Sequence, residues 1–249
     1  MNEEERYRFD LQGYLKIENA IAPETIAAMN QWFDRKAETD PQFAGRDGET
    51  LSVDNLLVWS PDFMGLLDNP RVLPYLKELC GEQVRLDHDY CHVSRKPGPK
   101  LTLHGGGLPY DPRQYYHCVE GKMYNGLVVA SYALTDTPQG AGGFCCIPGS
   151  HKSAFRCPDN IQKMQISSDL VQSVPCKAGD CIVFTEALTH GTLPWQAEAT
   201  RRALFFKYSP GHIAWSKNYY AAAQTNAFIA EVTPLLNEAQ RRLLHAPHG

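Results

Sequence analysis

Short stretches rich in β-branched and aromatic residues fill the middle and later parts of the chain, and they limit most strongly which folds it can adopt. They cover residues 84–94, 126–134, 181–184 and 203–208, with Gly or Pro near their ends. Helical patterns lie outside these stretches. An α-rich start followed by mixed β-runs predicts a mainly β protein with flanking helices, built as a double-stranded β-helix, the jelly roll of cupin-like proteins.

The flanking helical patterns carry recognisable end signals. Pro23 can open a helix with one apolar face, and residues 69–81 combine a cap, a first-turn proline and a terminal glycine. A further helix is expected to begin at Thr233 and Pro234 and to carry a leucine-rich face. We expect the first two helices to brace the β-core and the last to serve packing or a dimer contact.

The length of the chain fits a single domain. At 249 residues and 43% hydrophobic content, it can bury a substantial core. We expect one domain over residues 1–249, with helices in 1–82, the jelly-roll core in 83–212 and a helical segment in 213–249.

Charge and hydropathy narrow the classes of partner. The formal net charge is −4, which disfavours a nucleic-acid polymer because such binding needs many cations to neutralise phosphates. We find no apolar run of about 18 residues and no signal peptide. These features predict a cytoplasmic protein without a membrane partner. We expect it to be a monomer or homodimer.

Eight cysteines are dispersed along the chain with no Cys-x-x-Cys pair. They are Cys80, Cys91, Cys118, Cys145, Cys146, Cys157, Cys176 and Cys181. This spacing predicts free thiols in a reducing compartment rather than a disulfide framework, and nothing in it calls for a zinc site.

The segment His104-Gly105-Gly106 offers a metal-binding histidine but lacks the acid that usually accompanies it. Non-haem iron oxygenases bind Fe(II) through two histidines and one carboxylate. The first histidine and the carboxylate usually form His-x-Asp, because residues i and i+2 of a strand point to the same face. Here Gly106 occupies the second position. The other histidine must come from a distant strand, and His190 is the natural candidate.

Several segments resemble one family in their order and approximate spacing. They are residues 9–15, His104-Gly105-Gly106, residues 134–136, 142–144 and 148–152, residues 178–180, and finally His190, Thr192 and Arg201. The chain resembles the phytanoyl-CoA dioxygenase family of Fe(II)/2-oxoglutarate enzymes, most closely over roughly residues 85 to 210. In that family the segment at residues 148–152 is a structural signature, so we do not count His151 among the ligands.

The resemblance implies a set of cofactors and the residues that hold them. It assigns Fe(II) to His104 and His190, with 2-oxoglutarate and O₂ as cosubstrates. Arg201 takes the position of the arginine that grips the 2-oxoglutarate carboxylate, and a guanidinium fork suits bidentate carboxylate binding. Thr192 can donate its hydroxyl to the same carboxylate. Arg202, on the opposite face of the strand, is expected to be solvated.

The departure at Gly106 is the one shown by the halogenases of this superfamily. It implies a halogenase that chlorinates an aliphatic C–H bond, with Gly106 as the open halide position. The physical logic is that removing a carboxylate removes one negative ligand and opens space at the iron. Chloride is a negative ligand of suitable size, so it restores both the charge and the coordination number.

Other interpretations remain open. A hydroxylase would need a substitute carboxylate, and Asp111 and Glu120 are the nearest downstream acids. His88 and His92 share one strand face and form a rival metal site. The chain could also be a non-catalytic jelly roll that binds a small molecule.

Residues around the His104 segment suggest a substrate site. The candidates are Arg95, Arg113, Tyr110, Tyr115 and His117. Cations and aromatic faces together suit an anionic molecule that carries a ring. We expect a free small metabolite of the kind found in natural-product biosynthesis, with a purine nucleotide as the first guess.

Overall fold

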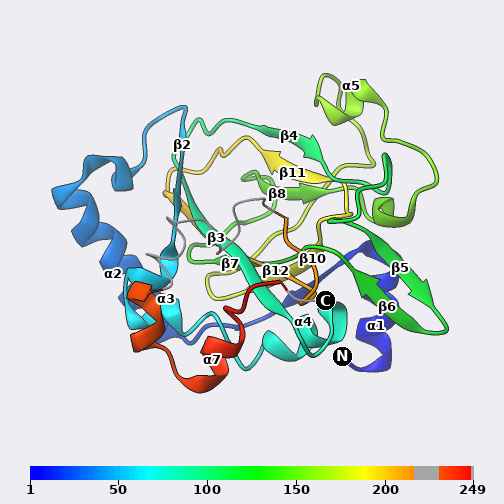
Figure 1. The fold of residues 1–249 in the computed structure, drawn as a ribbon. Helices are drawn as coiled ribbons and strands as arrows, with labels where there is room; N and C mark the ends of the chain where they lie inside the picture. Colours follow the sequence, from blue (N-terminus) through cyan, green and yellow to red (C-terminus); the bar gives the residue numbers. More distant parts are fainter. Residues whose placement is uncertain (216–229, 248–249) are drawn as a thin grey trace.

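Two β-sheets packed face to face form the centre of the molecule in this computed structural model (Figure 1). The structure describes residues 1–215 and 230–247. The expected jelly-roll architecture with flanking helices is confirmed.

The larger sheet has six strands, and every neighbouring pair in it is antiparallel. Its strands, in spatial order, are β1 (Tyr14–Ile17), β10 (Cys181–Thr185), β7 (Val128–Ala133), β12 (Arg201–Ser209), β3 (Arg85–Ser94) and β2 (Thr50–Asp54). Four of these strands match the predicted stretches closely. The two edge strands come from the N-terminal part, so residues 1–82, where we expected helices, contribute two strands as well. Their backbone groups extend the ladder at both edges of the sheet.

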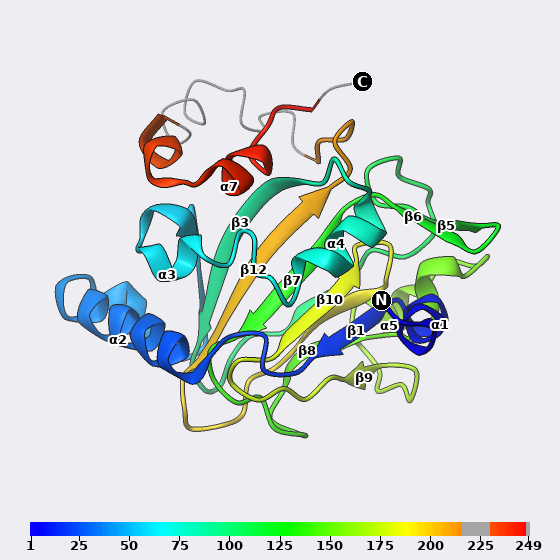
Figure 2. The same cartoon turned by 90° about the horizontal axis from the view of Figure 1, so that it is seen from below.

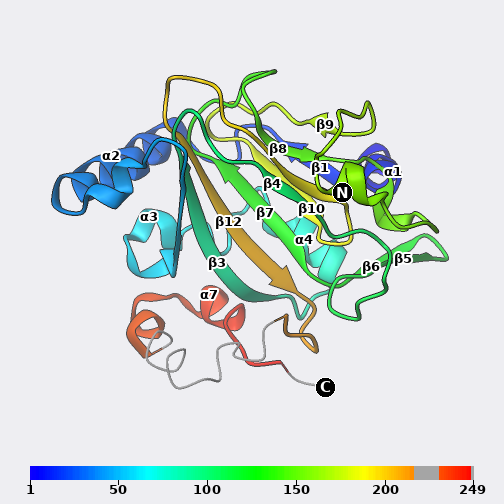
Figure 3. The ribbon, with the colours of Figure 1, turned by 90° about the horizontal axis from the view of Figure 1, so that it is seen from above.

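The smaller sheet has four strands and lies over the larger one (Figure 3). In spatial order these strands are β4 (Leu101–His104), β11 (His190–Leu193), β8 (Gly143–Cys146) and β9 (Gln172–Ser173). A separate hairpin joins β5 (Tyr116–Val119) to β6 (Lys122–Asn125).

Helices cover the outer face of the larger sheet (Figure 2), whereas the short helix α5 (Asp159–Gln162) lies beside β4 of the smaller sheet (Figure 1). The α-helices are α1 (Glu3–Gln12), α2 (Pro23–Thr39), α3 (Pro61–Met64), α4 (Leu73–Cys80), α5 (Asp159–Gln162) and α7 (Glu238–Arg242). Short 3₁₀ turns are η1 (Pro41–Ala44), η2 (Leu56–Val58), η3 (Ser150–Lys152) and η4 (Thr233–Leu235). The single helix expected from Thr233 is therefore two short pieces, because Asn237 caps a new helix after η4.

Strand β12 shows how the two faces of the larger sheet differ. Leu204 and Phe206 point outward into a core shared with the helices, whereas Ala203 and Phe205 point inward between the sheets. This alternation is the period of two that a pleated strand imposes. The same alternation directs side chains near both ends of β12 into the space between the sheets.

Arg202 is not solvated, contrary to the expectation. Its side chain points outward, where it donates hydrogen bonds to the carbonyl oxygen and Oδ1 of Asn30 and to Oδ1 of Asp34 on α2. Its guanidinium also lies 5.1 Å from the ring centroid of Phe33. A helix covers this face of the sheet, so the arginine ties α2 to β12 instead of facing water.

All eight cysteines are free thiols in this structure, and six of them are buried. Among the described helices, none combines the length and the apolar character needed to cross a bilayer.

A buried carboxylate on β3 makes stability depend on pH. Oδ1 of Asp89 accepts a hydrogen bond from the backbone N–H of Leu56 at 3.0 Å, and burial raises the pKa of this carboxyl to about 6. An unfolded aspartate titrates near 3.9. As pH rises from about 4 to about 6, the unfolded chain releases this proton while the folded chain keeps it. Rising pH therefore lowers the free energy of unfolding over this range.

Replacing Asp89 with Asn should remove this penalty. The amide keeps the oxygen that accepts from Leu56 but carries no charge. The quantity to compare is the free energy of unfolding of Asp89→Asn minus that of the wild type. We expect this difference to be roughly 1–2 kcal/mol larger at pH 8 than at pH 4.5, because only the wild type must bury a charged carboxylate at pH 8. Denaturant unfolding at the two pH values tests this. An equal effect at both values would contradict it.

Candidate metal and cosubstrate site

The pairing of β4 with β11 brings two predicted metal ligands together. His104 and His190 are direct partners in this antiparallel pair, and their ring centroids lie 4.1 Å apart. His190 is buried and His104 is half-buried. Two histidines 86 residues apart in the sequence thus meet because the ends of their strands pair in register.

Backbone carbonyls orient both imidazoles. Nδ1 of His190 lies 2.7 Å from the carbonyl oxygen of Leu188, and Nδ1 of His104 lies 3.2 Å from that of Thr102. Each Nδ1 therefore carries the proton and donates it, which leaves each Nε2 lone pair for another partner. Burial lowers the pKa of His190 to about 3, which keeps the ring neutral, as a metal ligand must be.

Glu186 adds a carboxylate to the histidine pair. Ligand atoms of Glu186, His104 and His190 all lie within 4.8 Å of one another, and Oε1 of Glu186 is 3.9 Å from Nε2 of His190. The side chain of Glu186 is 3% exposed. Within residues 1–215 and 230–247, this is the one group of three such side chains close enough to share an ion. Two histidines and one carboxylate form the donor set that non-haem iron sites use.

Lys207 neutralises this buried carboxylate. Its Nζ donates to Oε1 of Glu186 at 2.6 Å. Burial alone would raise the pKa of Glu186, but Lys207 and then His190 lower it to about 2. Glu186 is therefore an anion at neutral pH, although it is buried.

Glycine at position 105 allows the His104 loop to touch the turn that holds Glu186. A Cβ on Gly105 would lie 2.4 Å from the carbonyl oxygen of Leu188 and 2.5 Å from that of Glu186, which no real Cβ tolerates. Its φ of +76° lies in the left-handed region, which also favours glycine. The site therefore depends on a close approach between two backbone segments.

Gly106 does not lie on a strand. The expectation that residues 104 and 106 point to the same face of one strand is therefore wrong. Strand β4 ends at His104, and Gly106 has a φ of +101°. A residue at position 106 therefore does not project beside His104 as a strand neighbour would. A Cβ there would also lie 3.0 Å from Oγ1 of Thr189. An aspartate at this position would be strained.

Arg201 points into the same cavity from the other sheet. Thr192, His104, His190, Glu186 and Lys207 share this cavity with it. Arg201 is 4% exposed, and its Nε and Nη1 atoms have no hydrogen-bond partner in the described part of the chain. Burial lowers the pKa of this guanidinium to about 10, but it remains charged at neutral pH. A buried cation with unsatisfied donors is suited to bind an anion such as a carboxylate.

The other proposed ligands lie elsewhere. Asp111 is in an ion pair with Arg113, with 2.7 Å between Oδ2 and Nη2, and Glu120 is exposed in the turn between β5 and β6. His88 and His92 do face the space between the sheets, but no third ligand-type side chain groups with them in the described residues. The acid that lies beside the two histidines is instead Glu186.

The five predicted substrate residues do not form one mouth in the described structure. Tyr110, Tyr115 and His117 line a shallow pocket beside β5, where the ring of His117 stacks on Tyr115 with centroids 5.5 Å apart. Arg113 pairs with Asp111, and Arg95 lies 3.5 Å from a carboxylate oxygen of Asp47. Both arginines are already paired with acids.

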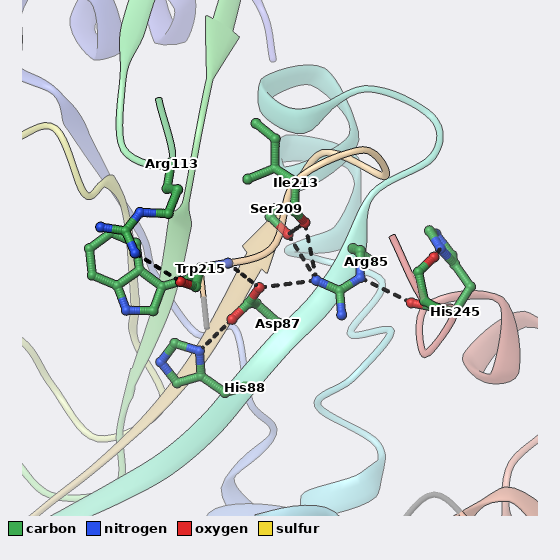
Figure 4. Close-up of polar contacts among 9 residues, drawn as sticks. Arg85, Asp87, His88, Arg113, Ser209, Ile213, Trp215 and His245 are labelled. Atoms are coloured by element: carbon green, nitrogen blue, oxygen red, sulfur yellow. Dashed lines mark hydrogen bonds and ion pairs between the residues drawn. The ribbon is translucent and has the colours of Figure 1, made fainter. Parts of the chain in front are cut away.

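A second buried polar cluster lies at the start of β3, around Arg85 and Asp87 (Figure 4). The carboxylate of Asp87 accepts hydrogen bonds from Nη1 of Arg85 at 3.0 Å and from the backbone N–H of Trp215 at 2.9 Å. Its other oxygen lies 2.8 Å from Nδ1 of His88. This cluster fixes the chain that follows β12 against β3, and His88 is the cross-strand partner of Lys207.

Reasoning from the sequence missed Glu186 and Lys207. The predicted substitutes, Asp111 and Glu120, lie shortly after Gly106 in the sequence, whereas Glu186 precedes His190 by four residues. A turn separates the two, since the N–H of Leu188 donates to the carbonyl oxygen of Thr185 at 2.9 Å. A charged residue inside the buried segment 181–190 is the signal that could have found it.

Comparison with known proteins gives a family match. The family model described as phytanoyl-CoA dioxygenase (PhyH) matches residues 9–203.

Among curated proteins, ectoine dioxygenase from Streptomyces anulatus is 28% identical over 169 residues, covering 62% of this chain and 54% of the relative. Ectoine dioxygenase from Bordetella parapertussis is 25% identical over 160 residues, covering 60% and 49%. The chain spans about half the length of these curated relatives.

Among solved structures, the crystal structure of HygX from Streptomyces hygroscopicus with nickel and 2-oxoglutarate bound is similar over most of the chain. Its sequence is 25% identical and the TM-score is 0.77, with 90% of this chain and 94% of HygX covered.

Gly105 offers a direct test of the backbone contact. We expect Gly105→Ala to weaken metal binding at least tenfold and to lower the melting temperature, because the added methyl group forces the His104 loop away from the Glu186 turn. Gly121→Ala is the matched control, since Gly121 has the same φ of +76° but no atom within 4 Å of the point where a Cβ would lie. Isothermal titration with Co(II) and thermal melts measure both effects. Equal losses in the two variants would contradict the proposed contact.

Proposed function

The chain belongs to the phytanoyl-CoA dioxygenase family, and from this we propose that it is an Fe(II)- and 2-oxoglutarate-dependent oxygenase. In this proposal it oxidises a C–H bond of a small polar molecule. The pairing of His104 with His190 beside the buried, unpaired guanidinium of Arg201 carries the proposal, because imidazoles suit Fe(II) and the guanidinium suits a carboxylate of 2-oxoglutarate.

His104 and His190 are the residues that we assign to the metal. Their Nδ1 atoms are held by carbonyl oxygens, so both Nε2 atoms are preoriented toward a common partner. The neutral state of the buried His190 supports the same assignment.

Arg201 is the residue that we assign to 2-oxoglutarate. Its unpaired, buried guanidinium needs an anion, and the distal carboxylate of 2-oxoglutarate meets that need. Thr192 lines the same cavity and can donate its hydroxyl to the carboxylate. With iron and 2-oxoglutarate bound, such a site couples the oxidative decarboxylation of 2-oxoglutarate by O₂ to oxidation of the substrate.

The substrate that we propose is a free small metabolite. Ectoine dioxygenases are named for a small molecule, and a crystal structure of HygX contains hygromycin B. A purine nucleotide remains a prediction from the sequence, but pairing of Arg95 and Arg113 with acids reduces its support.

Halogenation is a second candidate, and the charges in the cavity favour it. Lys207 neutralises Glu186, and Arg201 balances one charge of 2-oxoglutarate. Counting Fe(II) and the dianion of 2-oxoglutarate, the cavity retains one positive charge, which chloride would neutralise. Gly106 carries no side chain that could bind the metal from the His104 loop. In this case the reaction would form a carbon–chlorine bond.

Anaerobic titration with Fe(II) and 2-oxoglutarate tests the proposed function. We expect a visible metal-to-ligand charge-transfer band in the wild-type protein and none in His104→Ala. Absence of the band in the wild type would contradict the oxygenase proposal. Repeating the titration with chloride separates the candidates, because a band that shifts or tightens with chloride favours halogenation and an unchanged band favours oxygen insertion.

Arg201 and Arg202 form a matched pair for testing the 2-oxoglutarate assignment. We expect Arg201→Gln to weaken 2-oxoglutarate binding roughly 30-fold or more, as the loss of a buried charge-assisted contact typically does. Arg202→Gln should leave this affinity within about threefold while lowering the melting temperature, because Arg202 instead binds α2. Titration of the iron-loaded protein with 2-oxoglutarate measures both. Similar losses of affinity in the two variants would argue against the assignment.

A further inference from the structure

We propose that Glu186 is the third protein ligand of the metal, supplied from the turn before β11 in place of an acid at position 106. This inference rests on the proposed function and deepens it. It predicts that the metal site is complete without a halide, although position 106 is glycine.

Distance and burial support Glu186 as a ligand. Its ligand atom lies within 4.8 Å of those of both histidines, and its side chain is 3% exposed. A buried carboxylate is costly unless it is paired or binds a cation. The backbone of its turn is also fixed, because the N–H of Glu186 donates to the carbonyl oxygen of Leu127 at 2.9 Å.

Lys207 binds only one oxygen of this carboxylate. The hydrogen bond at 2.6 Å goes to Oε1, and no described residue donates to Oε2. Ligating carboxylates are commonly hydrogen-bonded by an outer partner that orients them. Lys207 is thus a positioning residue: the Oε1 atom that it binds also lies 3.9 Å from Nε2 of His190, so the lysine holds the carboxylate beside the histidine pair.

The local backbone explains why the ligand changes position. Strand β4 stops at His104 and Gly106 has a positive φ, so an acid at 106 would be strained and would not lie beside His104. The close contact of Gly105 with the carbonyl oxygen of Glu186 brings the two ligand-bearing segments together instead. Gly106 thus disfavours an acid at its own position, while Gly105 lets the turn that carries Glu186 lie close to His104.

A tethered carboxylate also has an advantage over chloride. Glu186 is already buried in the cavity, whereas chloride must lose its hydration to enter it. A group positioned by the fold has a high effective concentration at the metal. Glu186 should therefore occupy the position ahead of the halide.

Binding of Co(II), a spectroscopic substitute for Fe(II), tests this inference without turnover. We expect Glu186→Gln to weaken Co(II) binding at least 100-fold and to change the visible d–d spectrum, because an anionic ligand is lost. Asp111→Asn and Glu120→Gln are matched controls, since both remove a carboxylate that lies outside the cluster. Both should bind Co(II) with the affinity and spectrum of the wild type.

A second variant guards against misfolding. Glu186→Gln leaves Lys207 buried without its carboxylate, so the double variant Glu186→Gln/Lys207→Met removes both charges together. We expect it to melt near the wild-type temperature and still to bind Co(II) at least 100-fold more weakly. Lys207→Met alone should retain the wild-type d–d band positions, with affinity reduced by roughly 10–100-fold as for loss of an outer partner.

The outcomes separate this inference from the proposed function. If Glu186→Gln and the folded double variant bind Co(II) with wild-type affinity and spectrum, Glu186 is not a ligand and the inference is overturned, while the oxygenase proposal stands. If the wild type binds no Co(II), or if His104→Ala binds it equally well, the proposed metal site itself fails and the inference fails with it.

Discussion

The contact between the backbone of Gly105 and the turn at residues 185–189 is the constraint on which the candidate site depends. Without a Cβ at position 105, the end of β4 can pack against the carbonyl oxygens of Glu186 and Leu188. That approach aligns His104 with His190 across the β4–β11 pair. A methyl group placed 2.4 Å from an oxygen would force one of the two backbone segments to shift, and the distances among the candidate ligands would change with it.

The rest of the cavity follows from the alternation of one long strand. In β12, Arg201, Phe205 and Lys207 face the smaller sheet, while Arg202 and Leu204 face the helices. Inward positions near the two ends of β12 therefore place two cations in the cavity, six residues apart in the sequence. Lys207 reaches Glu186, and Arg201 has no carboxylate partner in the described structure. The two cations can thus act differently, one as a partner of a protein acid and the other as a receptor for a ligand acid.

Much of this arrangement could be predicted from the sequence, and the exceptions have physical causes. Strand periodicity predicted that Arg201 and Arg202 face opposite sides, but it could not show that α2 covers the outer side and engages Arg202. The i and i+2 rule assumed that the strand continues beyond His104, whereas two consecutive positive φ angles end it. Glu186 was missed because its relation to the histidines depends on a turn and on pairing between distant strands. Local periodicity carries no information about such contacts.

The position of the carboxylate bears directly on the chemistry that the cavity can support. Glu186 brings a negative charge into the cavity together with the positive charge of Lys207, whose Nζ donates to its Oε1. The fold therefore supplies a ligand without changing the net charge of the cavity. The surplus positive charge that results favours an additional anion, which could be chloride or an acidic group of the substrate. If Glu186 occupies the third protein position, the first coordination sphere needs no halide, and the surplus charge is then available to select an anionic substrate.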